Sequence, residues 1–237
     1  MLQSSASHKR SVIIRGALYE KTGCCNRRDS RSYSHHDLSA ALYGNRNRFD
    51  YLKDLDKTVF TLDGTDYQLR DMTYYIARQE MEIEKQAMVY DPDDTNAYWG
   101  LHTNGKFVRL EAKRAVLDRV VHDMMFYEAA KKEDMELDEK EQQYARDSAS
   151  DLCYDLSDEQ KERAGLTDEE IYEMTDKAAL AEKYQKILAD KEGENFGAYD
   201  YNGKAYEKML EEHKLKVKKK FWDKVPFGNV TLNHKFE

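Results

Sequence analysis

The stretch FVRLEAKRAVLDRVVHDM, residues 107–124, decides the fold class. Apolar side chains recur in it three and four residues apart, a spacing that places them on one face of an α-helix. They are Phe107, Leu110, Leu117, Val121 and Met124, with Val116, Val120 and Tyr127 widening the stripe. Charged residues fall on the other faces. We therefore expect a long amphipathic helix here, within a helical run over residues 106–190.

Three further helix starts are marked by capping boxes, in which a short side-chain oxygen accepts from a backbone N–H and a Glu or Gln reaches back to the cap. The pairs are Asp138 with Glu141, Ser157 with Gln160, and Thr167 with Glu170. Gly165 suits the end of the middle helix, because glycine tolerates the left-handed conformation found there. These signals predict a mainly α fold of several packed helices.

Short β elements are expected near both ends of this helical part. Residues 57–68 alternate in character around Asp63-Gly64, which is a hairpin-turn signal. A helix should follow from Leu69 and end before Asp91-Pro92. Near the C-terminus, Leu215 and Val217 alternate with lysines, which is typical of a lysine-edged strand. We expect one small β element formed by residues near 57–68 and 213–219.

Charge divides the chain into two parts. Residues 1–50 contain nine Lys or Arg against four Asp or Glu, a net +5, whereas the whole chain carries −8. This segment lacks apolar periodicity and is predicted to be a basic, disordered tail. Residues 51–237 are predicted to form a single helical lobe, closed by the segment 204–237. An acidic body gives no reason to expect nucleic-acid binding.

The sequence offers no catalytic or metal-binding constellation. The three cysteines, two of them adjacent, form neither a disulfide framework nor a zinc spacing. Cys24 and Cys25 with His35 and His36 are better explained as scattered residues of the tail, and Cys153 as a small core residue. We therefore expect no catalytic residue, no metal and no cofactor.

Aromatic and methionine side chains are abundant, and such residues suit adaptable peptide-binding surfaces. Most of them can simply fill the core. However, the four consecutive large residues 124–127 point in so many directions that some should reach a groove or a partner. The residues expected to bind peptide are Tyr75, Tyr98, Trp99, Met125 and Phe126.

The order of these elements resembles the foldase lobe of the SurA/PrsA-type extracytoplasmic chaperones, over about residues 57–232. The resemblance is carried by FTLDGTDYQLRDMTYYIARQE (Phe60–Glu80), EAKRAVLDRVVHDMMFYEAAKKEDMELDEKE (Glu111–Glu141), LTDEEIYEMTDKAALAEKYQKIL (Leu166–Leu188) and HKLKVKKKFWDKV (His213–Val225). It implies a SurA N-terminal-like lobe, formed from both ends of the chain, that binds unfolded or extended client proteins in an apolar cleft. It also implies a place in the cell envelope of a Gram-positive bacterium.

The chain departs from that family in one respect. Many members carry a parvulin prolyl-isomerase domain before the closing segment, and the short connection between Leu188 and His213 holds no comparable stretch. A non-catalytic chaperone is therefore the leading hypothesis. The alternatives are a peptidyl-prolyl isomerase of the same family and a non-catalytic interaction or structural subunit, for instance a homodimer. The chain itself shows no signal peptide or membrane span, so its localisation is left open.

Overall fold

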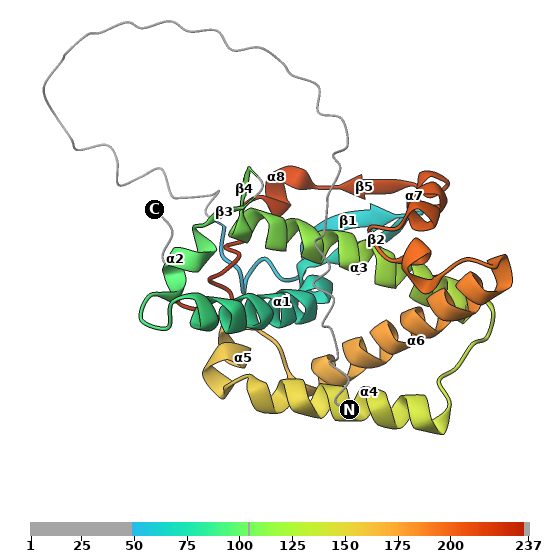
Figure 1. Ribbon diagram of the computed structural model, residues 1–237, viewed down its shortest axis with the longest axis horizontal. Helices are drawn as coiled ribbons and strands as arrows, with labels where there is room; N and C mark the ends of the chain where they lie inside the picture. The colour runs from blue at the N-terminus through green and yellow to red at the C-terminus, as the bar shows by residue number, and fades with distance from the viewer. Residues whose placement is uncertain (1–48, 104, 235–237) are drawn as a thin grey trace, which may run out of the picture. The chain divides into compact units, whose positions relative to one another are not determined.

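The computed structural model describes residues 49–103 and 105–234, which are mainly helical as predicted (Figure 1). The elements in chain order are β1 (Thr58–Leu62), β2 (Thr65–Gln68), α1 (Leu69–Tyr90), α2 (Thr95–Trp99), β3 (His102–Thr103), β4 (Lys106–Phe107), α3 (Val108–Lys132), α4 (Glu139–Asp155), α5 (Asp158–Ala164), α6 (Asp168–Glu192), the 3-10 helix η1 (Phe196–Tyr199), α7 (Lys204–Glu211), β5 (Leu215–Val217) and α8 (Lys219–Trp222). The predicted basic tail, residues 1–50, lies almost wholly outside the described residues.

The two ends of the described chain meet in one antiparallel sheet of order β2-β1-β5 (Figure 1). Strand β1 pairs with β2 through a turn at Asp63 and Gly64, whose φ angles of 51° and 93° need the left-handed region. On its other edge, Phe60 lies opposite Val217. This confirms the expected β element formed by residues 57–68 and 213–219.

The turn residue Asp63 links the hairpin to the strand from the far end of the chain. Its carboxylate accepts from the backbone N–H of Lys214 at 2.8 Å and lies 2.5 Å from Nδ1 of His213. The Lys214 hydrogen bond, followed by the one from His213, lowers the pKa of Asp63. One carboxylate thus fixes the turn of β1–β2 and the start of β5 together.

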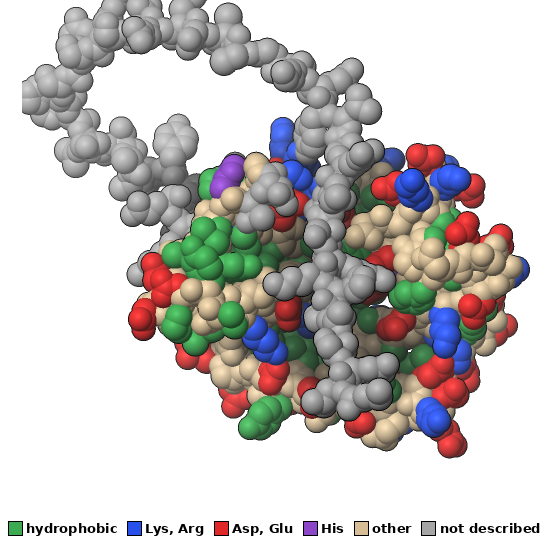
Figure 2. All heavy atoms as spheres, viewed as in Figure 1, with side chains coloured by type: hydrophobic (Ala, Val, Ile, Leu, Met, Phe, Trp, Pro, Cys, Tyr) green, Lys and Arg blue, Asp and Glu red, His purple; other side chains and the backbone are tan. Residues whose placement is uncertain are grey.

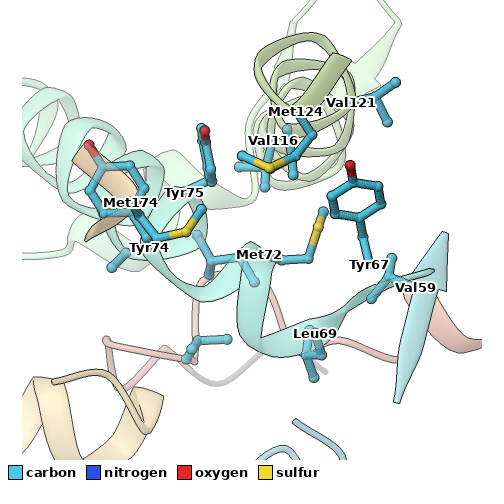
Figure 3. Close-up of a cluster of buried hydrophobic side chains, with 14 of the residues drawn as sticks. Val59, Tyr67, Leu69, Met72, Tyr74, Tyr75, Val116, Val121, Met124 and Met174 are labelled. Atoms are coloured by element: carbon cyan, nitrogen blue, oxygen red, sulfur yellow. The ribbon is translucent and has the colours of Figure 1, made fainter. Parts of the chain in front are cut away.

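Helix α3 is the centre of the core and packs against both α1 and α6. Val116, Val120, Val121 and Met124 are buried along it, as the periodicity predicted. Figure 3 shows Val116 and Met124 on the side of α3 toward Met72 and Tyr75 of α1, and Val121 on another side of α3. The first two residues of the predicted stripe, Phe107 and Leu110, are exposed instead. Phe107 belongs to strand β4, and Leu110 lies in the first turn of α3. On this part of α3 the side chain of Lys113 is buried.

All three predicted capping boxes are present. Asp138, Ser157 and Thr167 each accept a hydrogen bond from the backbone N–H three residues on, at 2.9, 3.3 and 3.2 Å. The reciprocal hydrogen bonds to Glu141, Gln160 and Glu170 are also made. Gly165 ends α5 with φ of 63°, as expected for a left-handed C-cap. These local signals set where α4, α5 and α6 begin.

The segment 223–234, which we name the C-terminal strap, is held by a buried carboxylate on α1. Glu80 is fully buried and accepts from the backbone N–H groups of Gly228, Val230 and Thr231 and from the Thr231 hydroxyl, at 2.6–3.2 Å. Burial raises the pKa of Glu80, and these four donors partly oppose that shift. The strap therefore supplies the donors that a carboxylate needs in the protein interior.

Two cations hold the strap from other helices. Arg163 of α5 donates to the carbonyl of Leu232 at 2.6 Å and also to Asn229 and Asn233. Lys113 of α3 donates to the carbonyls of Asp223 and Val225, both at 2.9 Å. Burial lowers the pKa of Lys113 from 10.5 to about 8. The strap is thus fixed to α1, α3 and α5 by hydrogen bonds to charged groups.

We expect the substitution Glu80→Ala to lower the free energy of unfolding by about 3 kcal/mol or more, because three backbone donors and one hydroxyl lose their acceptor inside the protein. Urea unfolding followed by circular dichroism measures this change. The matched control is Glu128→Ala on the exposed side of α3, for which we expect a change below about 0.5 kcal/mol. Equal losses in the two variants would contradict the role given to Glu80.

Lys113 predicts a pH dependence of stability. The folded protein releases the Lys113 proton near pH 8, whereas an unfolded lysine keeps it to about pH 10.5, so folding favours the neutral amine between these values. The free energy of unfolding of the wild type should therefore rise relative to that of Lys113→Met as the pH increases above 8. Parallel urea titrations from neutral to alkaline pH measure the difference, and a constant or falling difference would contradict the prediction.

Candidate functional site

A groove between α1, α3 and α4 is the candidate site, with a volume of about 410 Å³. It is lined by Tyr74, Tyr75, Arg78, Gln79, Met81, Glu82 and Lys85 of α1, Val116 and Arg119 of α3, and Ser148, Asp151, Leu152 and Asp155 of α4. Their spacing of three and four residues along α1 and α4 puts them on one face of each helix. Three rigid helices therefore position every side chain of the site.

The floor of the groove is apolar and aromatic. Tyr74, Tyr75, Val116 and Leu152 are buried there. The rings of Tyr74 and Tyr75 meet edge to face with their centroids 5.0 Å apart. Figure 3 shows both tyrosines on α1, with Tyr75 beside Val116 of α3. This floor offers an apolar surface to a bound side chain.

The two tyrosines differ in how their hydroxyl groups are satisfied. The Tyr74 hydroxyl accepts from Arg78 at 3.0 Å and lies 3.2 Å from the hydroxyl of Thr175. The buried Tyr75 hydroxyl has no hydrogen-bond partner among the described residues. Burial, followed by the charge of Asp123, raises the pKa of Tyr75 well above its usual value. Tyr75 is therefore neutral, and the charged group that acts most strongly on its hydroxyl is the Asp123 carboxylate.

One side of the groove is basic. Arg78 lies over the ring of Tyr74, 5.5 Å from its centroid, and Arg119 lies over the ring of Tyr201 at 5.2 Å. Both guanidinium groups therefore lie against an aromatic ring. Neither arginine forms an ion pair with a carboxylate of the described residues. Their hydrogen-bonding edges are therefore open to a ligand.

The opposite wall, formed by α4, is acidic. Asp151 and Asp155 of α4 line the groove, and Glu82 of α1 is a third carboxylate in the lining. Lys85 and Asp155 form a 3.2 Å ion pair that crosses from α1 to α4. Because both side chains are largely exposed, this pair contributes little to stability and can open. The groove thus combines an aromatic floor with walls of opposite charge.

A second hollow of about 490 Å³ lies between the start of α3 and the C-terminal strap. Its buried cation, Lys113, already donates to two carbonyl groups. Those hydrogen bonds hold the strap, so this hollow is better explained by the packing of the strap than by a ligand. The groove between α1, α3 and α4 is therefore the stronger candidate.

The structure brings only one of the five predicted peptide-binding residues into the groove. Tyr75 lines it, whereas Trp99, Met125 and Phe126 are core residues and Tyr98 lies half-buried on α2. We also expected an apolar cleft, whereas the walls of this groove carry charged side chains.

The reason for the burial of Met125 and Phe126 is that α3 is covered on several sides. Phe126 contacts the rings of Tyr184 on α6 and Tyr206 on α7, with centroids 5.7 and 6.0 Å away. His122, one turn earlier, lies 2.9 Å from the carbonyl of Tyr199 in η1. The inference that residues 124–127 are too crowded for one core was wrong, because the chain after α6 covers the face of α3 that α1 and α6 leave open.

Trp99 is buried for a different reason. Its indole N–H donates to Glu84 of α1 at 2.9 Å, and its ring packs near Phe227 and His234 of the C-terminal strap. It therefore joins α2 to α1 and to the strap. The sequence around Tyr98-Trp99 did not indicate that Trp99 is buried, because the strap that covers Trp99 comes from the far end of the chain.

Arg78, Arg119, Asp151 and Asp155 were not predicted as site residues. Charged residues on amphipathic helices normally form a solvated face, and no local pattern separates these from the others. One signal was present: Arg78 follows Tyr74 by four residues, the spacing at which side chains on a helix meet. The position of α4 opposite α1, which makes the groove, comes only from tertiary packing.

Exposed apolar side chains also gather around α2. Figure 2 shows hydrophobic groups over this part of the molecule, at the left of the view. The exposed residues near α2 in the chain are Met88, Val89, Tyr90, Phe107 and Leu110, and Tyr98 is half-buried. The rings of Tyr90 and Tyr98 lie 5.5 Å apart. We call these six residues the apolar patch.

No family model matches this chain, and neither a curated protein nor a solved structure matches it. The resemblance to the SurA/PrsA type therefore stays a prediction. Within residues 49–103 and 105–234, His, Cys, Asp and Glu side chains form no group suited to a metal ion. None of the helices in this part of the chain has the length and apolarity to cross a membrane.

The hydroxyl groups of Tyr74 and Tyr75 differ in their hydrogen bonds, so removing each of them should change the free energy of unfolding by a different amount. Tyr75→Phe should change the free energy of unfolding by less than about 1 kcal/mol, because the lost hydroxyl makes no hydrogen bond with the described residues. Tyr74→Phe should cost about 1–3 kcal/mol, because it loses its interactions with Arg78 and Thr175. Urea unfolding of both variants at neutral pH measures this, and a larger loss for Tyr75→Phe would contradict the assignment.

Proposed function

We propose that this protein binds unfolded or extended polypeptide segments in the groove between α1, α3 and α4, as a chaperone-like module without an isomerase domain. The observation that carries the proposal is the make-up of the groove. It has an aromatic floor and walls of opposite charge, all on helices. Side chains of an extended segment can rest on such a floor while charged and polar groups meet the walls.

The size and polarity of the groove suit weak and varied contacts. A volume of about 410 Å³ accommodates a few side chains rather than a folded domain. Arginine and tyrosine make hydrogen bonds and ring contacts with many partners. Release of a bound segment then needs no nucleotide, since each contact is weak. The resemblance to the SurA/PrsA lobe favours the same function, and it implies clients outside the cytoplasm.

A permanent partner or a second copy of the chain is the second candidate, and the apolar patch around α2 favours it. Met88, Val89 and Tyr90 expose 51%, 87% and 57% of their surface on the last turn of α1. Exposed apolar side chains that lie together often mark an interface, and the rings of Tyr90 and Tyr98 are in contact here. Light scattering separates the two functions. A dimer at low concentration that dissociates in the double variant Met88→Ser, Tyr90→Ser would favour this candidate.

The groove predicts the outcome of an aggregation assay. At stoichiometric amounts the wild type should suppress aggregation of a chemically unfolded client, and Ser148→Trp should lose this effect, because Ser148 lines the groove and an indole would fill it. Ser150→Trp is the matched control, since Ser150 is also exposed on α4 but does not line the groove. We expect it to behave like the wild type.

Two outcomes would contradict the proposal. Absence of any effect of the wild type on several clients would remove client binding as the function. Equal activity of Ser148→Trp and Ser150→Trp would move the binding surface away from the groove. Circular dichroism and thermal unfolding of both variants check that each has the native fold.

A further inference from the structure

We propose that the groove recognises a carboxylate of the bound polypeptide, which lies between the guanidinium groups of Arg78 and Arg119 and accepts hydrogen bonds from both. This inference rests on the proposed function and specifies the chemistry that the groove selects. The carboxylate can come from an Asp or Glu side chain or from the C-terminus of a chain. Both sources present the same planar pair of oxygens.

The two arginines are held ready for such a group. Arg78 is fixed by its 3.0 Å hydrogen bond to Tyr74 and by its position over that ring. Arg119 is fixed by its position over the ring of Tyr201. Both line the same groove, and neither has an ion-pair partner among the described residues. A planar guanidinium that is already oriented loses less entropy when it binds a carboxylate in a two-point contact.

The Tyr75 hydroxyl is not the donor for this carboxylate. It is buried, and the negative charge of Asp123 acts on it more strongly than the positive charge of Arg78. A second carboxylate beside it would be repelled. The donors that the groove offers are therefore the two guanidinium groups.

The charge balance of the groove favours a carboxylate within a peptide over a free phosphate. Its lining contains three cations and three carboxylates, and the carboxylates lie mainly on the α4 wall. Asp151 there has no ion-pair partner in the described part of the chain. A doubly charged anion would meet this wall unfavourably. A segment that carries one carboxylate and a nearby amine or guanidinium would match both walls.

The experiment measures fluorescence anisotropy of N-terminally labelled short peptides that share one sequence with a single lysine. The first has a central Glu and an amidated C-terminus, the second has Gln and a free C-terminus, and the third has Gln and an amidated C-terminus. The third peptide has no carboxylate and loses this charged hydrogen-bonded contact. It should therefore bind about 10- to 100-fold more weakly than at least one of the other two peptides. The tighter of the first two identifies the source of the carboxylate.

The variants Arg78→Gln and Arg119→Gln should each remove most of that difference while the fold, checked by thermal unfolding, is kept. Arg146→Gln is the matched control, since Arg146 is an exposed arginine of α4 outside the groove. It should bind all three peptides as the wild type does.

The possible failures can be told apart. Equal binding of the three peptides, with client aggregation still suppressed, would overturn carboxylate recognition and leave the proposed function standing. Retained selectivity in Arg78→Gln and Arg119→Gln would also overturn it. Displacement of the peptides by inorganic phosphate at low concentration would show a general anion site instead. Absence of both peptide binding and aggregation suppression would remove the proposed function as well.

Discussion

The structure depends on the enclosure of α3. This helix packs against α1 and α6, receives η1 through the hydrogen-bonding contact of His122 with Tyr199, and holds the C-terminal strap through Lys113. Because α3 is covered on several sides, its large side chains can be buried even though they point in different directions. Enclosure of this kind requires segments from both ends of the described chain. The β1–β5 pairing and the strap are the parts that bring those ends together.

The groove is a consequence of how the other helices surround α3. Helix α4 packs on α6 and meets α1 chiefly across the groove, where an exposed Lys85–Asp155 ion pair connects them. Space therefore remains above Tyr74, Tyr75 and Val116. Since the walls of this space are helical surfaces that face water, their side chains are charged. An aromatic floor below charged walls follows from the geometry, and it gives the site its selectivity for mixed polar and apolar ligands.

Buried charge has a different role away from the groove. Glu80, Arg163 and Lys113 hold the strap by hydrogen bonds to backbone groups rather than by ion pairs with one another. Removing any of them leaves unsatisfied polar groups inside the protein, which is more costly than the loss of a surface charge. By contrast, Arg78 and Arg119 make no hydrogen bond to the backbone of residues 49–103 and 105–234. This difference separates residues that maintain the fold from residues that remain available to a ligand.

The sequence by itself determined the local structure of this protein. The capping boxes at Asp138, Ser157 and Thr167, the turn at Asp63-Gly64 and the apolar periodicity of α3 depend on neighbours within a few residues. They could therefore be predicted without knowledge of the fold. Only the tertiary structure decided which large side chains are core and which charged ones form a site. Trp99 and Phe126 are covered by segments from distant parts of the chain, and Arg78 and Asp151 line one groove only because α4 lies opposite α1. Contacts between residues so far apart in the chain leave no periodic pattern, because they follow from the packing of whole helices.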